Sequence, residues 1–499
     1  MEMQNFAPVM FAGLVIVMLI GFPVAFSLAA LGLGCGFYAI EMGWFPAAFM
    51  GNLPISIFSI LNNDLLLAIP FFTFMGAILE KCGLAEDMLD SMGQLFGPIR
   101  GGLGYSVIIV GFILGAITGT VAGQVIAMAL ISLPVMIRYG YNMRYATGVL
   151  AASGTITQLV PPSLVLVVLA DQLGRSVGDM YKGAWGPSLI QIAMFALYTF
   201  SLSIFKPHHV PGVPIEARTL NGWALWRKCL KGIIPSAVLI FTVLGSMGGL
   251  PFQDHAVATP TEAGAMGVVG ALILAGIHKR LSKALLWDAM QATMRLTAMV
   301  VFILIGSRVF SLVFQGVDGA KWVEHLLSGL PGGQVGFLIV VNIFVFFLAF
   351  FLDFFEIAFI IVPMLAPVAD KMGIDLIWFG VLLCVNLQTS FMHPPFGFAL
   401  FYLRGIADTL YKEKRIAVPV KSNDIYLGSI PWVIMQLMLV LVVIFVPQSV
   451  TSFLDKPEVV DVNSVVLEAA PAPDDASEPD AQQAPADDPM KDLPSADKK

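Results

Sequence analysis

Residues 151–163, AASGTITQLVPPS, and residues 384–396, CVNLQTSFMHPPF, both place a Pro-Pro pair behind small hydroxyl and amide side chains. Neither Pro161–Pro162 nor Pro394–Pro395 offers a backbone N–H, so a helix cannot continue through either pair without losing hydrogen bonds. Lipid does not replace those bonds, and the freed groups must be covered by protein or by a water-filled cavity. We therefore expect two breaks in otherwise apolar helices.

Such breaks have two interpretations. A proline pair can simply kink a helix for packing. In many transporters, by contrast, half-helix N-termini face an anion while unwound carbonyls and hydroxyls hold a cation near the middle of the bilayer, once in each repeat. The second copy of the stretch favours the transporter interpretation.

The two stretches share one register, because the residue number of Pro395 exceeds that of Pro162 by 395 − 162 = 233. Near the start of each half, Pro23 and Pro260 repeat at a slightly larger spacing, 260 − 23 = 237. This pattern predicts an internal duplication, with two inverted repeats in the membrane. The spacing of 233 also relates Pro134 to Pro367, Gly140 to Gly373, Ser153 to Asn386, Thr155 to Gln388 and Thr157 to Ser390.

The composition predicts an all-α protein that crosses the membrane several times. Hydrophobic residues make up 58% and charged residues 12% of the 499 residues, and the mean hydropathy is +0.84, far above that of soluble proteins. The apolar segment from Phe6 lacks a basic leader, so we interpret it as a retained span. Cys35, Cys82, Cys229 and Cys384 show no metal-ligand spacing. No catalytic motif appears either, so we expect no enzyme and no cofactor.

The chain divides by composition into four parts. We expect a first transmembrane repeat over 1–205, a basic cytoplasmic connector over 206–231, a second repeat over 232–447, and an acidic, Pro/Ala-rich tail over 448–499 that is disordered. The basic groups at 278–283 and 404–421 are expected on the cytoplasmic side with the connector. Residues 250–258 would then lie outside.

Sodium ions prefer oxygen ligands of the kind that these breaks supply. We expect a first sodium site between Ser153, Gly154, Thr155 and the turn at Gly119–Thr120. We expect a second between Asn386, Gln388, Thr389, Ser390 and Gly306–Ser307, where a polar group interrupts an apolar run.

Four further residues are candidates for the substrate path: Thr157, Arg308, Asp353 and His393. Asp353 corresponds to Thr120, since 353 − 233 = 120. An intramembrane carboxylate is a functional candidate by default, although Asp353 and Glu356 could also lie near a helix end in water. Arg308 is a possible charge partner for an anion. His393 is interpreted as a gate or packing residue and not as a catalyst.

Several long motifs resemble the large membrane subunit of TRAP transporters, the tripartite ATP-independent periplasmic family. They are AIPFFTFMGAILEKCGLAEDML, ISLPVMIRYGYNMRYATGVLAASGTITQLVPPSLVLVVLADQLGRSVGDMYKGA, ATPTEAGAMG and NLQTSFMHPPFGFALFYLRG. The resemblance covers most of residues 5–447. It implies a protein of the bacterial inner membrane in which each repeat holds a re-entrant helical hairpin and a broken transmembrane helix.

The resemblance also implies a mechanism and partners. Uptake of an organic acid anion would be driven by a sodium gradient as coupling ion, and a transport domain would slide against a scaffold as an elevator. A small four-helix membrane subunit and a periplasmic substrate-binding protein would assist. Family members often carry Thr before the second Pro-Pro, where this chain has His393. The resemblance does not identify the acid.

Two other functions remain open at this point. An ion-coupled antiporter or exporter of the same architecture would work without a binding protein. A membrane-embedded hydrolase would need an activated nucleophile with a base in reach, and the sequence shows no such pattern.

Overall fold

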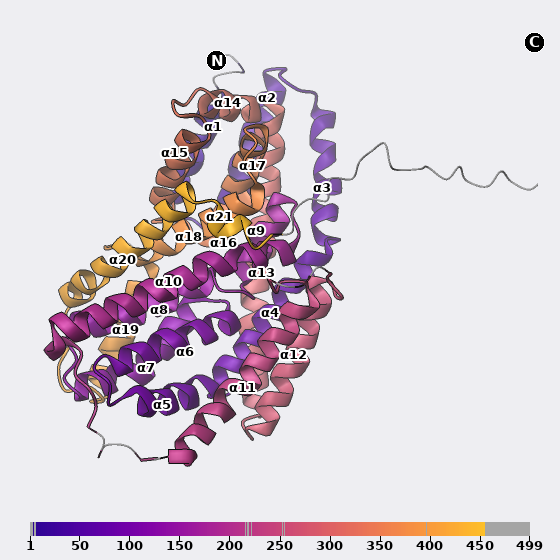
Figure 1. The fold of residues 1–499 in the computed structure, drawn as a ribbon. Helices are drawn as coiled ribbons and strands as arrows, with labels where there is room; N and C mark the ends of the chain where they lie inside the picture. Colours follow the sequence, from indigo (N-terminus) through magenta and orange to yellow (C-terminus); the bar gives the residue numbers. More distant parts are fainter. Residues whose placement is uncertain are drawn as a thin grey trace, which may run out of the picture. The chain divides into compact units, whose positions relative to one another are not determined.

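The computed structural model describes residue 3 and residues 6–454, except 215, 217, 218, 221, 252, 254 and 396, and for residues 117 and 118 it describes the backbone alone. Within these residues every regular element is a helix, as expected (Figure 1). The helices of the first half are α1 (Phe6–Ile20), α2 (Val24–Glu41), η2 (Ala47–Gly51), α3 (Asn52–Leu61), α4 (Asp64–Lys81), α5 (Leu84–Phe96), α6 (Gly102–Thr118), α7 (Val121–Arg138), α8 (Met143–Thr155), η3 (Ile156–Gln158), α9 (Leu164–Leu173), α10 (Val177–Phe205) and η4 (Pro207–His209).

The second half repeats this all-helical pattern. Its helices are α11 (Gly222–Ser246), α12 (Pro260–Ile277), α13 (Lys283–Gly316), α14 (Gly319–Ser328), α15 (Gly333–Leu348), α16 (Phe354–Glu356), the π-helix η6 (Ile357–Ile361), α17 (Val362–Lys371), α18 (Leu376–Met392), α19 (Phe398–Lys412), α20 (Ser422–Phe445) and α21 (Gln448–Thr451). The predicted acidic tail starts in α21, and its residues 455–499 lie outside the described residues.

Seven of the described helices are long and apolar enough to cross a membrane, or up to nine if each of two bent pairs is one span. The bent pairs are residues 47–61 with α4, at 46°, and α14 with α15, at 117°. Large apolar side chains such as Phe58, Trp226, Phe241 and Phe302 are more than half exposed on these helices. Since apolar side chains are stable where lipid covers them, these faces are suited to a bilayer.

The first half contains a helical hairpin made of α6 and α7. The chain reverses at Gly119, whose φ of +65° is readily adopted by glycine, and the Leu103 N–H near the start of α6 donates to the Tyr141 hydroxyl just beyond α7 (3.2 Å). Helix α6 runs parallel to α8, because close contacts follow both helices in the same order. These contacts join Gly104 to Tyr145, Gly111 to Ser153, and Gly115 to Thr157.

The second half contains a corresponding hairpin made of α15 and the segment α16–η6–α17. Its ends meet where the Gln334 side chain donates to the Met372 carbonyl (2.7 Å). Helix α15 runs parallel to α18, as α6 does to α8. Contacts again follow in order, from Phe337 with Phe379, through Asn342 with Asn386, to Phe346 with Ser390.

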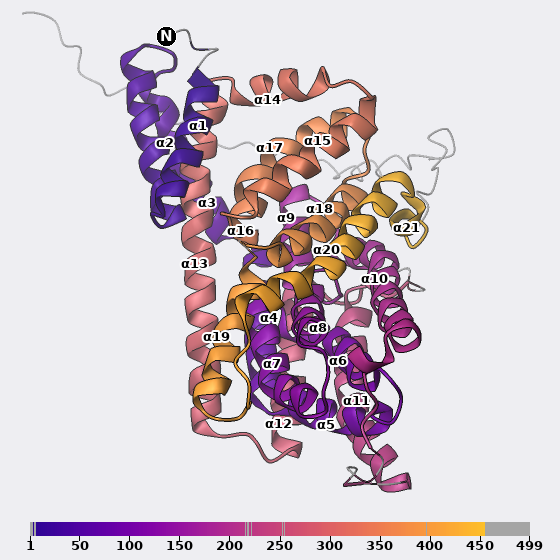
Figure 2. The same cartoon turned by 90° about the vertical axis from the view of Figure 1, so that its left-hand side faces the viewer.

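The two Pro-Pro stretches lie elsewhere, in broken helices. Figures 1 and 2 place α9 beyond the end of α8 and not beside it, so α8 and α9 form one broken helix. The counterpart in the second half is α18 followed by α19. Of the two forms expected for residues 145–173, a hairpin or a broken helix, the chain adopts the broken helix.

The predicted spacing recurs in the helix boundaries. The start of the segment α16–η6–α17 follows the start of α7 by 354 − 121 = 233, and its end follows the end of α7 by 371 − 138 = 233. The start of α18 follows that of α8 by 376 − 143 = 233. The amphipathic helices α5 and α14 precede the hairpins, and they lie at opposite ends of the molecule in Figure 2.

Gly306 and Ser307 lie within α13, a continuous helix of 34 residues, so the polar interruption of its apolar sequence does not break the helix. The Ser282 hydroxyl caps its start by accepting from the Leu285 N–H (3.1 Å). A Cβ on Gly306 would lie 2.3 Å from the carbonyl oxygen of Ala25 in α2. Gly306 therefore allows α13 to pack closely on α2, and its helical backbone is not unwound.

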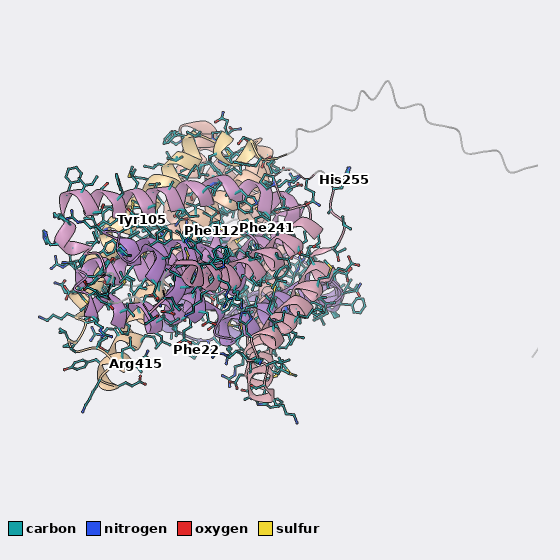
Figure 3. All side chains as sticks on the ribbon, turned by 60° about the horizontal axis from the view of Figure 1, so that its bottom comes forward. Phe22, Tyr105, Phe112, Phe241, His255 and Arg415 are labelled. Carbon is teal, nitrogen blue, oxygen red and sulfur yellow. The ribbon has the colours of Figure 1, made fainter. Side chains whose placement is uncertain are left out.

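Residues expected on opposite sides of the membrane lie far apart. In Figure 3, His255 before α12 and Arg415 after α19 lie on opposite sides of the molecule. The sides themselves stay a prediction from the positive-inside rule. The connector and the outer loop each include positions outside the described residues, namely 215, 217, 218 and 221, and 252 and 254.

Candidate functional site

The first broken helix is built by local capping around the proline pair. The Asn142 side chain accepts from the Arg144 N–H (3.0 Å) and starts α8. The helix tightens into η3 before Pro161 and Pro162 interrupt it. The Ser163 hydroxyl then accepts from the Val165 N–H (3.2 Å) and starts α9. The break thus begins after Gln158, and the predicted tip residues Ser153, Gly154 and Thr155 form the last turn of α8 instead.

These last-turn residues are buried against the hairpin α6–α7. The Gln124 side-chain amide of α7 donates to the carbonyl oxygens of Ser153 (2.8 Å) and Gly111 (2.5 Å). A Cβ on Gly154 would lie only 2.1 Å from Cγ2 of Val125. Thr155 Oγ1 accepts from the Gln436 amide of α20 (3.1 Å). One cluster therefore joins α7, α8 and α20.

Near the first break, three buried oxygen atoms have no hydrogen-bond partner among the described residues: Ser153 Oγ, Thr157 Oγ1 and Gln158 Oε1. The same holds for Thr73 Oγ1 on α4. Burying a hydroxyl without a partner is costly. A cavity of about 10 Å³ is lined by Thr73, the Gly119–Thr120 turn and Pro162. A space of this size holds about one water molecule, so this region suits a single small oxygen-bound species.

The break in the second broken helix begins later than expected. Asn386, Gln388, Thr389 and Ser390 all lie within the regular helix α18, which continues to Met392. Only the Pro-Pro pair after His393 ends it, and α19 begins beyond Phe396, a position outside the described residues. The prediction of an unwound segment over residues 386–390 is wrong.

The polar side chains of α18 nevertheless contact the second hairpin. The Asn386 amide donates to the Asn342 carbonyl (2.8 Å), and the Ser390 hydroxyl donates to the Phe346 carbonyl (3.2 Å). Just beyond these carbonyls, α15 ends at Leu348 and the backbone is not helical over residues 349–353. The polar side chains of α18 therefore face the hairpin near this unwound tip, while Ser307 lines a different, polar cavity with Arg308.

Asp353 occupies this tip as the N-cap of α16. Its carboxylate accepts from the Phe354 N–H (2.7 Å), and the Glu356 carboxylate accepts from the Asp353 N–H (2.9 Å). Thr120 likewise precedes the first residue of α7. The sequence spacing thus correctly matched Asp353 with Thr120, since both lie at the N-terminus of the second hairpin helix.

His393 packs between aromatic rings at the end of α18. Its ring centroid lies 5.4 Å from those of both Phe346 and Phe350. Nδ1 is buried and makes no hydrogen bond to the described residues. This packing is the role that the sequence favoured, and the second broken helix thereby holds the tip of α15 through an aromatic contact.

The two halves meet through buried polar contacts. The side-chain amides of Gln191 in α10 and Gln388 in α18 each donate to the other's oxygen (3.0 Å). The Cys384 thiol donates to the Gln158 carbonyl at the first break (3.0 Å). Thr155 and Thr389 are both fully buried. The middle of α18 is therefore packed in the protein interior against α10 and the first break, and not against lipid.

Residues 11–449 match the family described as "Tripartite ATP-independent periplasmic transporter, DctM component". The chain belongs to the DctM family of TRAP transporters. It is therefore one component of a tripartite transporter in the bacterial inner membrane, and it is a permease and not an enzyme.

The chain is similar to several curated DctM relatives. It is 27% identical to the C4-dicarboxylate TRAP transporter large permease protein DctM of Rhodobacter capsulatus, across 88% of this chain and 97% of the relative. It is 25% identical to the 2,3-diketo-L-gulonate TRAP transporter large permease protein YiaN of Escherichia coli, across 86% of this chain and 94% of that relative. It is also 25% identical to the isethionate TRAP transporter permease protein DctMQ of Oleidesulfovibrio alaskensis, across 83% of this chain and 62% of that relative.

A solved structure shares the fold of this DctM chain. The YdaH transporter of Alcanivorax borkumensis, described as having an unusual topology, superimposes with a TM-score of 0.55 over 87% of this chain and 98% of that one. The sequences are 15% identical, so the likeness concerns the fold alone.

The DctM structure places the predicted site residues in several groups. Gly119 and Thr120 line the small cavity with Pro162, while Ser153 and Thr157 lie against Gly111 and Gly115 of α6. Gly154 packs on α7, Thr155 faces α20, and Asn386, Ser390 and His393 contact α15. Gln388 faces Gln191, and Thr389 bonds within its own helix to Val385. Arg308 lies apart, in a polar cavity on α13.

Sequence reasoning missed Gln191 and Gln436 as partners of the broken helices, and Asn63 and Asp171 in the polar cavity with Arg308. Gln191 and Gln436 are single polar residues within apolar helices, whereas Asn63 and Asp171 each lie beside another polar residue. That pattern was a usable signal, since a polar side chain inside a membrane protein faces its interior. The partners themselves lie far away in the chain and could not be identified from it.

Proposed function

We propose that this DctM component takes up a small organic acid anion at the expense of a sodium gradient. A periplasmic binding protein delivers the anion, and a small four-helix membrane subunit acts beside the permease. The named substrates of the relatives, C4-dicarboxylate, 2,3-diketo-L-gulonate and isethionate, are all organic anions. The DctMQ name, and this chain's 62% coverage of that protein, support a partner that contributes the remaining length.

The observation that carries the sodium proposal is the set of buried, unpartnered oxygens at the first break. Ser153 Oγ, Thr157 Oγ1 and Thr73 Oγ1 are hydroxyl oxygens, which are the hard ligands that sodium prefers. The small cavity between Thr73, the Gly119–Thr120 turn and Pro162 leaves room for one ion. A sodium ion in this region would take hydroxyl ligands and hold hairpin α6–α7 against the broken helix α8–α9.

The second hairpin tip supplies a corresponding place in the other half. The backbone at residues 349–353 is unwound, and the buried Asn342 Oδ1 has no hydrogen-bond partner among the described residues. Asn386 and Ser390 fix α18 against this tip. With both tips ordered by sodium, the interior region between the breaks would bind the substrate anion through half-helix N-termini and hydroxyls.

The two hairpins and two broken helices would form the moving part of an elevator, related by an inverted repeat. The equal spacing of their boundaries and the opposite positions of α5 and α14 support that relation. The long helices α4 and α13, which pack against α12 and α2 respectively, would belong to the scaffold.

The experiment that tests this function is uptake of labelled acids into proteoliposomes that hold the complete transporter. Uptake is expected only when sodium is higher outside, and a sodium ionophore should abolish it. A potassium gradient of the same size is the control. Equal uptake with either ion would refute sodium coupling.

Replacing Ser153 by Ala provides a sharper test of the first site. If Ser153 Oγ binds sodium, the half-saturating sodium concentration for uptake should rise about tenfold, equivalent to about 1.4 kcal/mol. Without sodium the variant should be at least as stable as the parent, because it loses a buried hydroxyl that has no partner.

The control for this variant is Ser236→Ala in α11, since Ser236 is equally buried but its hydroxyl donates to the Gly232 carbonyl (3.0 Å). That variant should change stability and leave the sodium dependence unchanged. An unaltered sodium dependence in Ser153→Ala would remove Ser153 from the site.

A further inference from the structure

A polar cavity of about 250 Å³ lies apart from both helix breaks. It is enclosed by the α3–α4 junction, the C-terminal half of α9, the middle of α13 and the segment η6–α17. Its polar lining includes Ser59, Asn63, Asp171, Gln172, Arg308 and Ser311. Its size is slightly below the usual range of small-molecule sites, so it suits a compact ligand of a few carbon atoms.

Arg308 is the cation of this cavity, and it is exposed. It lies in α13, a helix apolar enough to cross the membrane, and among the described residues no carboxylate forms an ion pair with it. A guanidinium in such a helix is costly unless it meets an anion or water. Its planar donors match a carboxylate, which can accept two parallel hydrogen bonds.

Asp171 is the anion of the same cavity, and amide groups already hold it. Asn63 Nδ2 donates to Oδ1 (2.9 Å), and Gln172 Nε2 donates to Oδ2 (2.8 Å). These bonds keep the carboxylate in place without Arg308. Each of its oxygens can accept one more hydrogen bond, so it would attract a hydroxyl group and repel a second carboxylate.

We propose that this cavity binds a monocarboxylate that carries hydroxyl groups. The carboxylate of the ligand pairs with Arg308, and its hydroxyls donate to Asp171 and exchange hydrogen bonds with Ser59 and Ser311. A dicarboxylate binds less well, because its second charge meets Asp171. This inference rests on the proposed transport of organic acids and narrows their class.

The cavity also lies between two groups of helices. One group is the proposed moving part, which includes α9, η6 and α17, and the other is the proposed scaffold, which includes α4 and α13. The Asn63–Asp171 hydrogen bond joins the α3–α4 junction to α9. The π-helix η6 contributes Phe359 to the wall, and π-helical turns occur often at functional sites. A ligand in this cavity would touch both groups at once.

The test measures the thermal unfolding of the full, purified chain in lipid nanodiscs containing sodium. The probes are gluconate as a hydroxylated monocarboxylate, succinate as a dicarboxylate, and glucose as a neutral polyol of similar size. Gluconate should stabilise the chain at concentrations about tenfold lower than succinate does, and glucose should have no effect. Equal or better stabilisation by succinate would overturn the proposed selectivity.

Substitutions in the cavity test which residues bind gluconate. Arg308→Gln should weaken gluconate binding at least about tenfold, while Arg308→Lys, which keeps the charge without the planar fork, should weaken it less. Arg295→Gln is the matched control, because Arg295 is an exposed arginine on the same helix and does not line the cavity. Asp171→Asn should bring succinate and gluconate binding closer together. Unchanged gluconate binding in Arg308→Gln would overturn the site.

The outcomes separate this inference from the proposed function. If uptake does not depend on sodium but Arg308→Gln loses gluconate binding, sodium coupling is refuted and the proposed gluconate site is supported. If uptake of an acid is driven by sodium but that acid stabilises Arg308→Gln and the parent equally, the proposed function is supported and the proposed site at Arg308 is refuted.

Discussion

Gly154→Val is expected to abolish uptake. A Cβ at this position would lie 2.1 Å from Cγ2 of Val125, and neither the β-branched Val125 nor the new side chain can move aside. Helices α7 and α8 would have to separate, which moves Ser153 away from Gln124. Overpacking a buried site costs about 1–3 kcal/mol, which shifts an equilibrium by a factor of about 5–150 at about 1.4 kcal/mol per tenfold. The initial rate of labelled-acid uptake measures this effect.

The matched control for this variant is Gly405→Val in α19. Gly405 is exposed, and no atom lies within 4 Å of a Cβ built there, so uptake should be unchanged. Size-exclusion chromatography gives the amount of folded protein for both variants, and rates are compared per folded molecule. Parental uptake in Gly154→Val would mean that the close approach of α7 and α8 is not required for transport.

Asp353→Asn is expected to lower uptake about tenfold or more with little change in stability. Asparagine caps a helix about as well as aspartate, so α16 should still begin at the same residue. The substitution removes the negative charge of Asp353 from the unwound tip, where the second sodium ion is proposed to bind. A loss of uptake therefore measures the effect of removing the charge. Thermal unfolding in nanodiscs measures whether the helix cap is retained.

Two comparisons complete this test. Asp353→Ala removes both charge and cap and should also lose about 1 kcal/mol of stability. Asp375→Asn is the control, since Asp375 caps α18 through the Ile377 and Trp378 N–H groups (2.8 and 2.9 Å) but lies exposed outside the site. If Asp353→Asn transports like the parent, then Asp353 serves only as a helix cap.

The clearest difference between sequence and structure concerns Gly306. The sequence shows Gly-Ser-Arg inside an apolar run, a pattern that fits either a broken helix or a close helix crossing. Backbone propensity cannot choose between them, because one glycine costs a helix only about 1 kcal/mol. The contact with the carbonyl of Ala25, which lies in the second helix of the chain, decides for the crossing.

For Asn386 and Ser390, too, the sequence could not distinguish a broken helix from an intact one. Their polarity correctly placed them inside the protein, since a polar side chain in lipid is costly. It did not show whether they bond from a broken backbone or from a regular helix. The Asn342 and Phe346 carbonyls of α15 satisfy both side chains, so α18 can stay intact up to the prolines.

Features that depend on local chemistry and on the solvent could be predicted from the residues alone. Lipid excludes unpaired backbone groups, so composition required helices, and the Pro-Pro pairs required two breaks. The repeat spacing matched Asp353 to Thr120 without any coordinates. Three-dimensional packing selected which elements face each break, made α6–α7 a hairpin and α8–α9 a broken helix, and brought Arg308 and Asp171 into one cavity. These features depend on contacts between residues far apart in the chain, where shape and close packing select the partner, and no local pattern records that choice.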